Sequence, residues 1–406
     1  MAIQQAAQPS SQKLHVLIIG GGIAGLTLAQ ALRKYNISFT VFERDESATS
    51  RPQGWGISLH STLVTLENHV PGEVYDAICQ AQVNPEAGRD EVRGVPFVNL
   101  DTGKVEHMVP KSKRLRLRRD GVRLGLTKGL DILWGKKLAS ISRKGDDNAI
   151  CATFEDGTSY TGTVLVGADG AHSAVRRILA PDNNAWENRR LPCNAIGTSY
   201  YISGAKVNEL REQVDPLYFF GTDPKTNTYA FWSMLEQPDD GGMMYKMQLY
   251  FSWIPSGDER ELVGLSPAEV FKLKGATMFP TLREVMAEMP EDAVVSYVNL
   301  VEWPAVAWDN WDGMATLAGD AAHCMSIYRG EGVNHGIIDG CVLADALKRA
   351  ADGVVCPRKA VEEYEAEMRL RGKEAVDVSH QACLDAHDYR KIETEGSFAL
   401  LGAKKV

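Results

Sequence analysis

The chain of 406 residues is 44% hydrophobic and 24% charged, and its formal net charge at pH 7 is −9. This length allows a large hydrophobic core and more than one domain. The acidic balance argues against nucleic acid or an anionic membrane surface as a partner, because both attract clustered Lys and Arg.

Cysteine usage and hydropathy narrow the class further. The seven cysteines form no CxxC pair, which argues against a disulfide framework or a metal site and favours buried, small apolar residues. Residues 1–14 are polar, which predicts a loose tail and not a signal peptide. No segment has the roughly eighteen unbroken apolar residues that cross a bilayer. We therefore expect a cytoplasmic protein without a membrane span, and the sequence leaves its oligomeric state open.

The first elements in the chain form a βαβ unit. His15–Ile19 is predicted as a buried strand, Ile23–Lys34 as a helix and Ser38–Phe42 as a second strand, an order typical of a parallel, doubly wound sheet. The basic run at residues 111–119 is interpreted as a strand that leads into a helix. Two later short strands, residues 163–166 and 314–318, run directly into the stretches GADGAHSAVRRIL and GDAAH.

The middle of the chain has a different pattern. Along residues 245–253, large apolar side chains alternate strictly with mostly polar ones, as in a strand with one buried face. Residues 229–235 and 294–303 are similar, so we predict a second, mostly antiparallel sheet inserted between strands of the first. Its face rich in Tyr, Trp, Met and Phe would suit a flat apolar substrate. From about Pro357 the chain is predicted to be helical and packed on the outside.

A glycine-rich turn follows the first strand. Gly20, Gly22 and Gly25 form GxGxxG between strand and helix, and Glu43 follows the second strand. The first glycine allows a tight turn, the second lets the backbone approach a pyrophosphate, and the third lets helix and strand pack closely. A carboxylate at the end of the second strand accepts hydrogen bonds from a ribose. The turn predicts a dinucleotide, either NAD(P) or FAD.

Two later stretches favour FAD. VLVGADGAHSAVR (residues 164–176) and GMATLAGDAAHCMSIYRGEGVNHGIIDG (residues 313–340) resemble, in order and spacing, two signatures of the class A, single-component FAD-dependent monooxygenases. The similarity is to their aromatic hydroxylase group, which includes para-hydroxybenzoate and salicylate hydroxylases, and it covers about residues 15–350.

The resemblance implies an α/β fold. A Rossmann-like FAD-binding domain with a parallel sheet would comprise residues 15–190 and 304–356, and an inserted, mostly antiparallel substrate domain would comprise residues 191–303. Residues 1–14 would form a flexible tail and residues 357–406 a C-terminal helical segment.

The resemblance also assigns cofactor contacts. Asp169 and Gly170 would help to hold FAD and the passing nicotinamide, and the Asp320 carboxylate would bind ribityl or ribose hydroxyls. The turn that opens the helix after Gly330 would direct its amides at the pyrimidine edge of the flavin, where negative charge collects on reduction. The stretches RPQGWGISL and RRDGVRLGL would add a loop glycine and an arginine. The full set of contacts is Gly20, Gly22, Gly25, Glu43, Gly56, Arg119, Asp169, Gly170, Asp320, Gly332, Val333 and Asn334.

Several of these residues have structural alternatives. Asp320 could cap a helix, and Arg119 could be a solvated surface arginine. Ser173 is predicted as a helix cap, and His172 and His323 are predicted to be structural.

The chain departs from the family pattern at two places. Cys324 and Ile327 stand where the family usually carries prolines, and the early strand of the substrate domain offers tyrosines where many relatives carry a catalytic arginine. No catalytic arginine can therefore be transferred. Candidates for a base or a phenolate-binding group are Tyr201, Tyr229 and Arg329, and core packing is the alternative for Tyr201 and for Trp232.

The family chemistry implies a cycle in which NADPH or NADH reduces FAD and oxygen adds to give a flavin C4a-hydroperoxide. This species would hydroxylate an aromatic, polyketide or indole-type small molecule in secondary metabolism, in a site that excludes water. Baeyer–Villiger oxygenation or epoxidation, and a flavin-binding redox sensor without turnover, are the alternatives. A flavin halogenase is disfavoured because the full tryptophan motif and the lysine of that family are absent.

Overall fold

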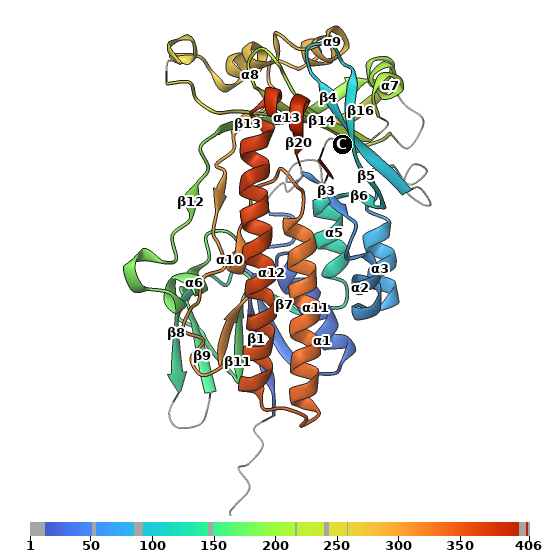
Figure 1. The fold of residues 1–406 in the computed structure, drawn as a ribbon. Helices are drawn as coiled ribbons and strands as arrows, with labels where there is room; N and C mark the ends of the chain where they lie inside the picture. Colours follow the sequence, from blue (N-terminus) through green and yellow to red (C-terminus); the bar gives the residue numbers. More distant parts are fainter. Residues whose placement is uncertain are drawn as a thin grey trace, which may run out of the picture.

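The computed structural model describes residues 13–50, 54–84, 92–144, 149–215, 217–238, 243–257, 259–397 and 403–404. A parallel sheet lies at one end of the molecule and a larger sheet at the other, and two long helices run beside the parallel sheet (Figure 1). The predicted βαβ unit is confirmed with the predicted bounds: β1 (His15–Ile19), α1 (Ile23–Lys34) and β2 (Ser38–Phe42).

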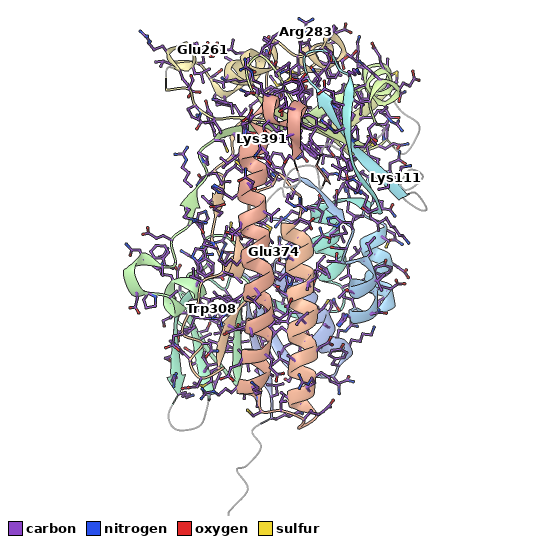
Figure 2. The ribbon with its side chains drawn as sticks, in the orientation of Figure 1. Lys111, Glu261, Arg283, Trp308, Glu374 and Lys391 are labelled. Atoms are coloured by element: carbon purple, nitrogen blue, oxygen red, sulfur yellow. The ribbon has the colours of Figure 1, made fainter. Side chains whose placement is uncertain are left out.

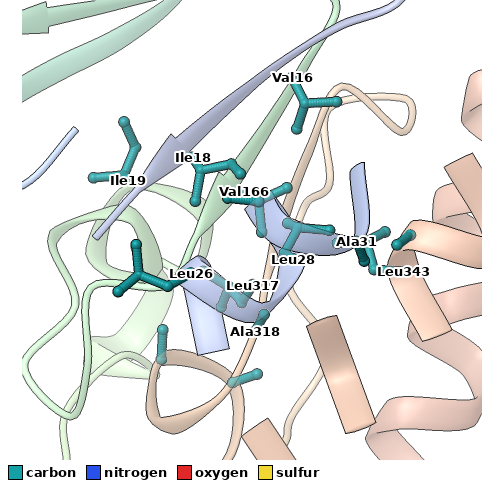
Figure 3. Close-up of a cluster of buried hydrophobic side chains, with 14 of the residues drawn as sticks. Val16, Ile18, Ile19, Leu26, Leu28, Ala31, Val166, Leu317, Ala318 and Leu343 are labelled. Atoms are coloured by element: carbon teal, nitrogen blue, oxygen red, sulfur yellow. The ribbon is translucent and has the colours of Figure 1, made fainter. Parts of the chain in front are cut away.

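The five strands of the parallel sheet have the order β19-β11-β1-β2-β7. Val16 of β1 pairs with Val164 of β11 on one side and with Phe39 of β2 on the other. Their side chains and those of the covering helices form one buried apolar cluster (Figure 3). The remaining bounds are β7 (Ile132–Leu133), β11 (Val164–Gly167) and β19 (Ala315–Leu317).

Helices cover this sheet and extend beyond it. α1 packs closely against α11 (Gly332–Ala351). The two helices are so near each other that a Cβ on Gly340 would lie 2.8 Å from the Leu28 nitrogen. α12 (Pro357–Ala386) runs along α11 and reaches the second sheet, where the Ala386 carbonyl accepts a hydrogen bond from Thr222 at 2.8 Å. Trp308, which Figure 2 labels on one side of α12, donates to Glu365 of this helix at 3.1 Å. The helical segment predicted from Pro357 is thus confirmed.

The second sheet has seven strands in the order β17-β13-β16-β15-β14-β4-β5. Its neighbours are antiparallel except β14 and β4, which are parallel. Two of its strands precede residue 191, so the predicted boundary does not separate the two sheets. The bounds are β4 (Val92–Asn99), β5 (Val105–Lys113), β13 (Asn194–Ser203), β14 (Tyr218–Thr222), β15 (Tyr229–Glu236), β16 (Met244–Trp253) and β17 (Val295–Tyr297).

One face of this sheet packs against α7 (Gly204–Gln213), α8 (Pro267–Gly275) and α9 (Pro280–Ala287). Phe251 stacks on Phe271 of α8 with ring centroids 4.4 Å apart, and Tyr200 donates to the Val285 carbonyl of α9 at 3.1 Å. The apolar face that we predicted for the substrate is therefore the helix-covered core of the domain. The opposite face, with Gln248 and Ser252, is turned towards the parallel-sheet end of the chain.

Smaller elements connect the two sheets. A two-stranded ribbon of β3 (Gly56–Leu59) and β6 (Leu115–Arg118) lies under the second sheet, and β6 continues into α5 (Arg119–Leu126), which confirms the predicted strand and helix at residues 111–119. The other bounds are α2 (Leu63–His69), α3 (Gly72–Cys79), β8 (Leu138–Lys144), β9 (Ala149–Phe154), β10 (Ser159–Gly162), α6 (Ala174–Leu179), β12 (Arg189–Arg190), β18 (Val301–Glu302), α10 (Asp320–His323), α13 (Tyr389–Glu395), β20 (Gly396–Ser397) and β21 (Ala403–Lys404), with single 3-10 turns at Asp182–Asn184 and Arg260–Leu262. None of the helices within the described ranges could serve as an apolar membrane span.

Candidate active site

The glycine turn after β1 lies directly against the end of β11. Gly20 has a φ of +114°, its N–H donates to the Phe42 carbonyl at 2.8 Å, and a Cβ at this position would lie 2.3 Å from the Ala168 oxygen. A Cβ on Gly25 would lie 2.2 Å from the Gly20 oxygen. Both positions therefore require glycine, for the turn and for the close approach that the sequence predicts.

Glu43 at the end of β2 holds this turn from the other side. Its carboxylate accepts hydrogen bonds from the Gly21 amide at 2.7 Å and from the Asp45 amide at 3.0 Å. Arg123 of α5, which is 3% exposed, lies 3.5 Å from Glu43 and 3.6 Å from Asp45 and donates to the Gly21 carbonyl at 2.8 Å. The turn, the carboxylate and the arginine form one buried ionic cluster.

The second predicted stretch follows β11. Asp169 accepts hydrogen bonds from the Ser173 hydroxyl and, at 2.6 Å, from the Ala174 amide, and Ser173 caps α6 by accepting from the Arg176 amide. The predicted cap role of Ser173 is confirmed. The Asp169 side chain thus starts α6, while Gly170, with a φ of +84°, has open space where a Cβ would stand.

Arg176 connects this segment to the third stretch. It is 1% exposed, donates to the carbonyls of Asp320 and Ala321 at 3.3 and 3.1 Å, and lies over the Trp303 ring at 4.6 Å. The start of α10 is thereby fixed to the start of α6.

Asp320 begins α10 and lies near the start of α11. Solvent reaches its side chain, and a Cβ on Gly332 would be 3.8 Å from its carboxylate. Desolvation by the surrounding protein raises the pKa of Asp320, and the charges of His323 and Arg119 oppose the rise. Arg119 therefore lies close enough to influence this carboxylate. α11 begins at Gly332 without a side-chain cap, so its first amides, which include those of Gly332 and Val333, have no intrahelical partner.

Asn334 is fully buried and is engaged with the protein. Its amide oxygen accepts from the His60 amide at 3.1 Å and from the Thr62 hydroxyl at 2.9 Å, and its amide nitrogen donates to the Ser58 carbonyl at 3.0 Å. Asn334 thus attaches the start of α11 to the segment that follows Gly56.

His323 has the structural role that we predicted. It is fully buried, and its Nε2 lies 2.7 Å from Asp339, which also accepts from the Gly319 amide at 2.6 Å. His172, by contrast, is exposed and lies 3.4 Å from Asn188.

The predicted catalytic candidates occupy three different environments. Tyr229 is buried, its ring lies edge-on to Tyr328 with centroids 5.1 Å apart, and burial raises its pKa well above the usual value. Tyr201 is 49% exposed and lies beside Lys246, so the alternative of core packing is wrong for this residue. Trp232 does pack in the core, stacked on Phe219. Arg329 lies 3.8 Å from Glu331.

Arg116 of β6 is a functional candidate that sequence reasoning missed. Its Nε donates to Ser233 of the second sheet at 3.0 Å and its Nη1 donates to Ser58 of β3 at 3.2 Å, while its guanidinium lies 5.0 Å from the Tyr218 ring centroid. The buried Nη2 atom has no hydrogen-bond partner. Among the residues that the structure describes, no carboxylate lies within ion-pair distance of Arg116. Its position in the alternating run at residues 115–118 resembles that of a surface residue, so no local sequence pattern indicates its burial.

Arg123, which sequence reasoning also missed, offers a test of the ionic cluster. Replacing it in Arg123→Met leaves the buried Glu43 carboxylate without the guanidinium that lies 3.5 Å from it, which should lower the free energy of unfolding by about 3–5 kcal/mol. Arg118→Met is the matched control, because Arg118 is partly exposed and its pairs with Asp120 and Glu236 are 3.7 Å or longer. Urea unfolding followed by circular dichroism measures both changes, and equal stability of the two variants would contradict this description of the cluster.

Comparisons with known proteins identify the family of this chain. The FAD binding domain family matches residues 13–188 and 282–379. The chain is 39% identical over 347 residues to the FAD-dependent monooxygenase dbaB of Emericella nidulans, and the aligned region covers 82% of this chain and 87% of that protein. It is 33% identical over 393 residues to the FAD-dependent monooxygenase phnB of Penicillium herquei, covering 96% and 95%.

A solved structure supports the fold. The structure of Klebsiella pneumoniae HpxO with FAD and uric acid superposes with a TM-score of 0.71 at 17% identity and covers 94% of this chain and 90% of that one. The family match, the identity to dbaB and phnB and the converging turns lead to one conclusion: the chain belongs to the FAD-dependent monooxygenases.

Proposed function

We propose that this enzyme uses NAD(P)H and O2 to hydroxylate an aromatic, polyketide or indole-type small molecule that carries an acidic hydroxyl, and that it acts in secondary metabolism. NAD(P)H is the typical co-substrate of the family, and dbaB and phnB, two FAD-dependent monooxygenases to which the chain is similar, come from fungi. The substrate class is supported mainly by Arg116.

The residues present fit FAD. Side chains at Gly20 and Gly25 would clash with the backbone, and the amides at the start of α1 have no side-chain cap. This arrangement suits a pyrophosphate. Asp320 offers a solvent-accessible carboxylate for sugar or ribityl hydroxyls, and the uncapped amides of Gly332 and Val333 suit the flavin pyrimidine edge. When bound, FAD would supply the transfer of electrons from NAD(P)H and the activation of oxygen.

Two of the predicted contacts would act through the backbone that they position, and not through a side chain that touches the cofactor. The side chains of Glu43, Asp169 and Asn334 already hold the backbone at the three turns. We propose that Asp169 and Asn334 position the backbone amides that contact the cofactor, and that Glu43 uses its remaining lone pairs for the ribose.

Arg116 is suited to bind an anionic oxygen on the substrate. Burial lowers its pKa to about 10, so the guanidinium remains charged at neutral pH. A buried charge without a counterion is costly, and a partner with negative charge removes much of that cost. Gly56 lies directly against this guanidinium, since a Cβ there would be 2.4 Å from Nη2. Because the resemblance places Gly56 towards the flavin, an oxyanion at Arg116 would hold the substrate near the reacting ring.

The aromatic side chains around Arg116 suit a flat substrate. Tyr218 and Phe231 lie within 5.3 Å of the guanidinium, on the face of the sheet turned towards the ribbon. Tyr229 stands on the same strand as Phe231, and its raised pKa makes it a hydrogen-bond donor at neutral pH and not a base. Electrostatic stabilisation of a phenolate or enolate would activate the substrate for attack by an electrophilic oxygen.

The function is tested directly with purified, FAD-loaded protein. NADPH and NADH are supplied with phenolic, polyketide and indole compounds under ¹⁸O2, and NAD(P)H consumption and product masses are recorded. We expect stimulated consumption and a product with one labelled oxygen and an intact ring. A ring expanded by oxygen or an epoxide would establish the alternative chemistry. No stimulated consumption with any compound would contradict the proposal.

The role of Asp320 is tested by FAD occupancy. Asp320→Ala removes hydrogen bonds to a charged acceptor, so FAD should bind about 10- to 100-fold more weakly. Asp352→Ala is the control, because Asp352 is a surface residue at the end of α11 that pairs with Lys348. The ratio of flavin to protein absorbance reports the occupancy, and unchanged binding in Asp320→Ala would place this carboxylate away from the cofactor.

The role of Arg116 is tested with paired substrates. Arg116→Met should lower kcat/KM by about 10- to 100-fold for a phenol that the wild-type enzyme turns over, because a charged hydrogen bond is lost. Its methyl ether cannot ionise, so the variant should change turnover of the ether little, and Arg116→Lys should recover part of the activity. Flavin occupancy confirms folding. An equal loss for phenol and ether would show that Arg116 only joins the ribbon to the sheet.

A further inference from the structure

Two cysteines from distant parts of the chain meet in the core between the second sheet and α12. Cys193 lies just before β13 and Cys383 lies near the end of α12, and their Sγ atoms are 3.5 Å apart. Both are buried, with exposures of 4% and 0%. The other five cysteines, all within the described residues, contact no second sulfur at hydrogen-bond distance. A modest approach of the two sulfurs would reach the distance of about 2 Å at which a disulfide forms.

The two thiols differ in acidity. The Cys383 thiol hydrogen bonds to the Cys193 sulfur and lowers the pKa of Cys193 to about 7, while the same contact raises the pKa of Cys383. Because thiolates are the nucleophiles in thiol chemistry, Cys193 is the attacking residue and Cys383 is the resolving one.

We propose that Cys193 and Cys383 form an oxidation site that hydrogen peroxide converts into an intramolecular disulfide. The Cys193 thiolate attacks one peroxide oxygen, the O–O bond breaks, and a sulfenic acid and hydroxide form; the hydroxide takes up the proton that the Cys193 thiol released. Cys383 then attacks the sulfenic sulfur, the S–O bond breaks, and water leaves with the Cys383 proton. Two thiols lose two electrons in total, and one peroxide becomes two waters.

The choice of hydrogen peroxide as the natural oxidant rests on the proposed function. A flavin monooxygenase that reduces oxygen without oxidising a substrate releases hydrogen peroxide inside the protein. The thiol pair lies next to Tyr328, in the segment between Asp320 and α11. Peroxide formed at the flavin would therefore meet this pair close to its origin, although both thiols are shielded from the bulk solution.

A chain of hydrogen bonds connects the thiol pair to this segment. His387 directs Nδ1 at the Cys383 carbonyl at 2.7 Å, so this nitrogen must be the donor. Burial lowers the pKa of His387 to about 4, so the neutral ring has Nε2 as an acceptor for the Ser252 hydroxyl at 3.0 Å. Tyr328 in turn donates to Ser252 at 2.9 Å, and its oxygen lies 3.4 Å from the Cys193 sulfur, a contact in which either atom can be the donor.

Oxidation would break this series of hydrogen bonds at one contact, the one between Cys193 and Tyr328. A disulfide sulfur has no hydrogen, so Cys193 could no longer donate to Tyr328. The same bond would tie α12 covalently to the start of β13. We therefore expect the disulfide to alter the environment of Tyr328 and of the turn that opens α11. The ionisable groups that influence the thiol pair are Arg190, Tyr229, Tyr250, Glu302 and Tyr328.

The site is tested on the full-length, FAD-loaded protein. Hydrogen peroxide is added at several pH values, remaining thiols are alkylated under denaturing conditions, and peptides are mapped by mass spectrometry without reduction. We expect a cross-linked Cys193–Cys383 peptide that dithiothreitol removes and that forms faster as the pH rises through about 7. Cys193→Ser and Cys383→Ser should abolish it, and Cys341→Ser should not, because Cys341 is a buried cysteine without a sulfur partner.

Two further measurements distinguish a failure of the disulfide proposal from a failure of the proposed function. The proposal would be overturned if Cys193 and Cys383 were still alkylated after peroxide treatment, or if each carried a separate sulfinic acid. The flavin occupancy of the serine variants shows whether these variants fold. NADPH is then supplied under air without substrate, with and without catalase. Cross-linking that persists in the presence of catalase supports peroxide formed inside the protein as the oxidant, whereas cross-linking that catalase prevents shows that the peroxide first enters the bulk solution. If NADPH is not oxidised, the proposed function fails, while the added-peroxide arm still decides the disulfide.

Discussion

The approach of the Gly20 turn to the end of β11 is the constraint on which the cofactor side of the molecule depends. The backbone at Ala168 occupies the space that any side chain on Gly20 would need. The parallel order of β1, β11 and β19 brings three turns to one edge of the sheet, and buried polar side chains then connect them. Arg123 fixes the first turn, Arg176 joins the second to the third, and Asp339 holds the Gly319 amide. The three turns are thereby held together by contacts within the protein.

Local sequence patterns predicted the helices and strands well, but they did not predict which strands pair with one another. The bounds of the βαβ unit, the strand and helix at residues 111–119 and the Ser173 cap depend on neighbouring residues, so the sequence contains the necessary information. The pairing of β4 with β14 depends on residues more than a hundred positions apart. The alternation along β16 was also recognised, but it reports only that two faces differ. Both faces of this strand are largely buried, so the pattern could not identify which face is turned towards the parallel sheet.

Buried arginines were the main omission at the site. Arginine is rarely buried without a partner, so a charged position in an alternating strand is normally assigned to the surface. At Arg116 the second sheet covers the ribbon, and the burial results from that tertiary contact. Arg123 and Arg176 lie within the recognised motifs, and their spacing from Arg119 and Asp169 was the signal that could have identified them.

Directional polar contacts join the two sheets. Gln248 accepts from the Gly56 amide at 2.9 Å, Ser233 accepts from Arg116, and Ser252 links Tyr328 with His387. Directional contacts of this kind fix the position of one sheet relative to the other, because each tolerates little displacement. The same precision holds the sulfurs of Cys193 and Cys383 in contact. The accurate placement of the second sheet and the sensitivity of the junction to oxidation therefore have a common structural cause. A substitution that removes these polar contacts should displace the second sheet and also separate the two sulfurs.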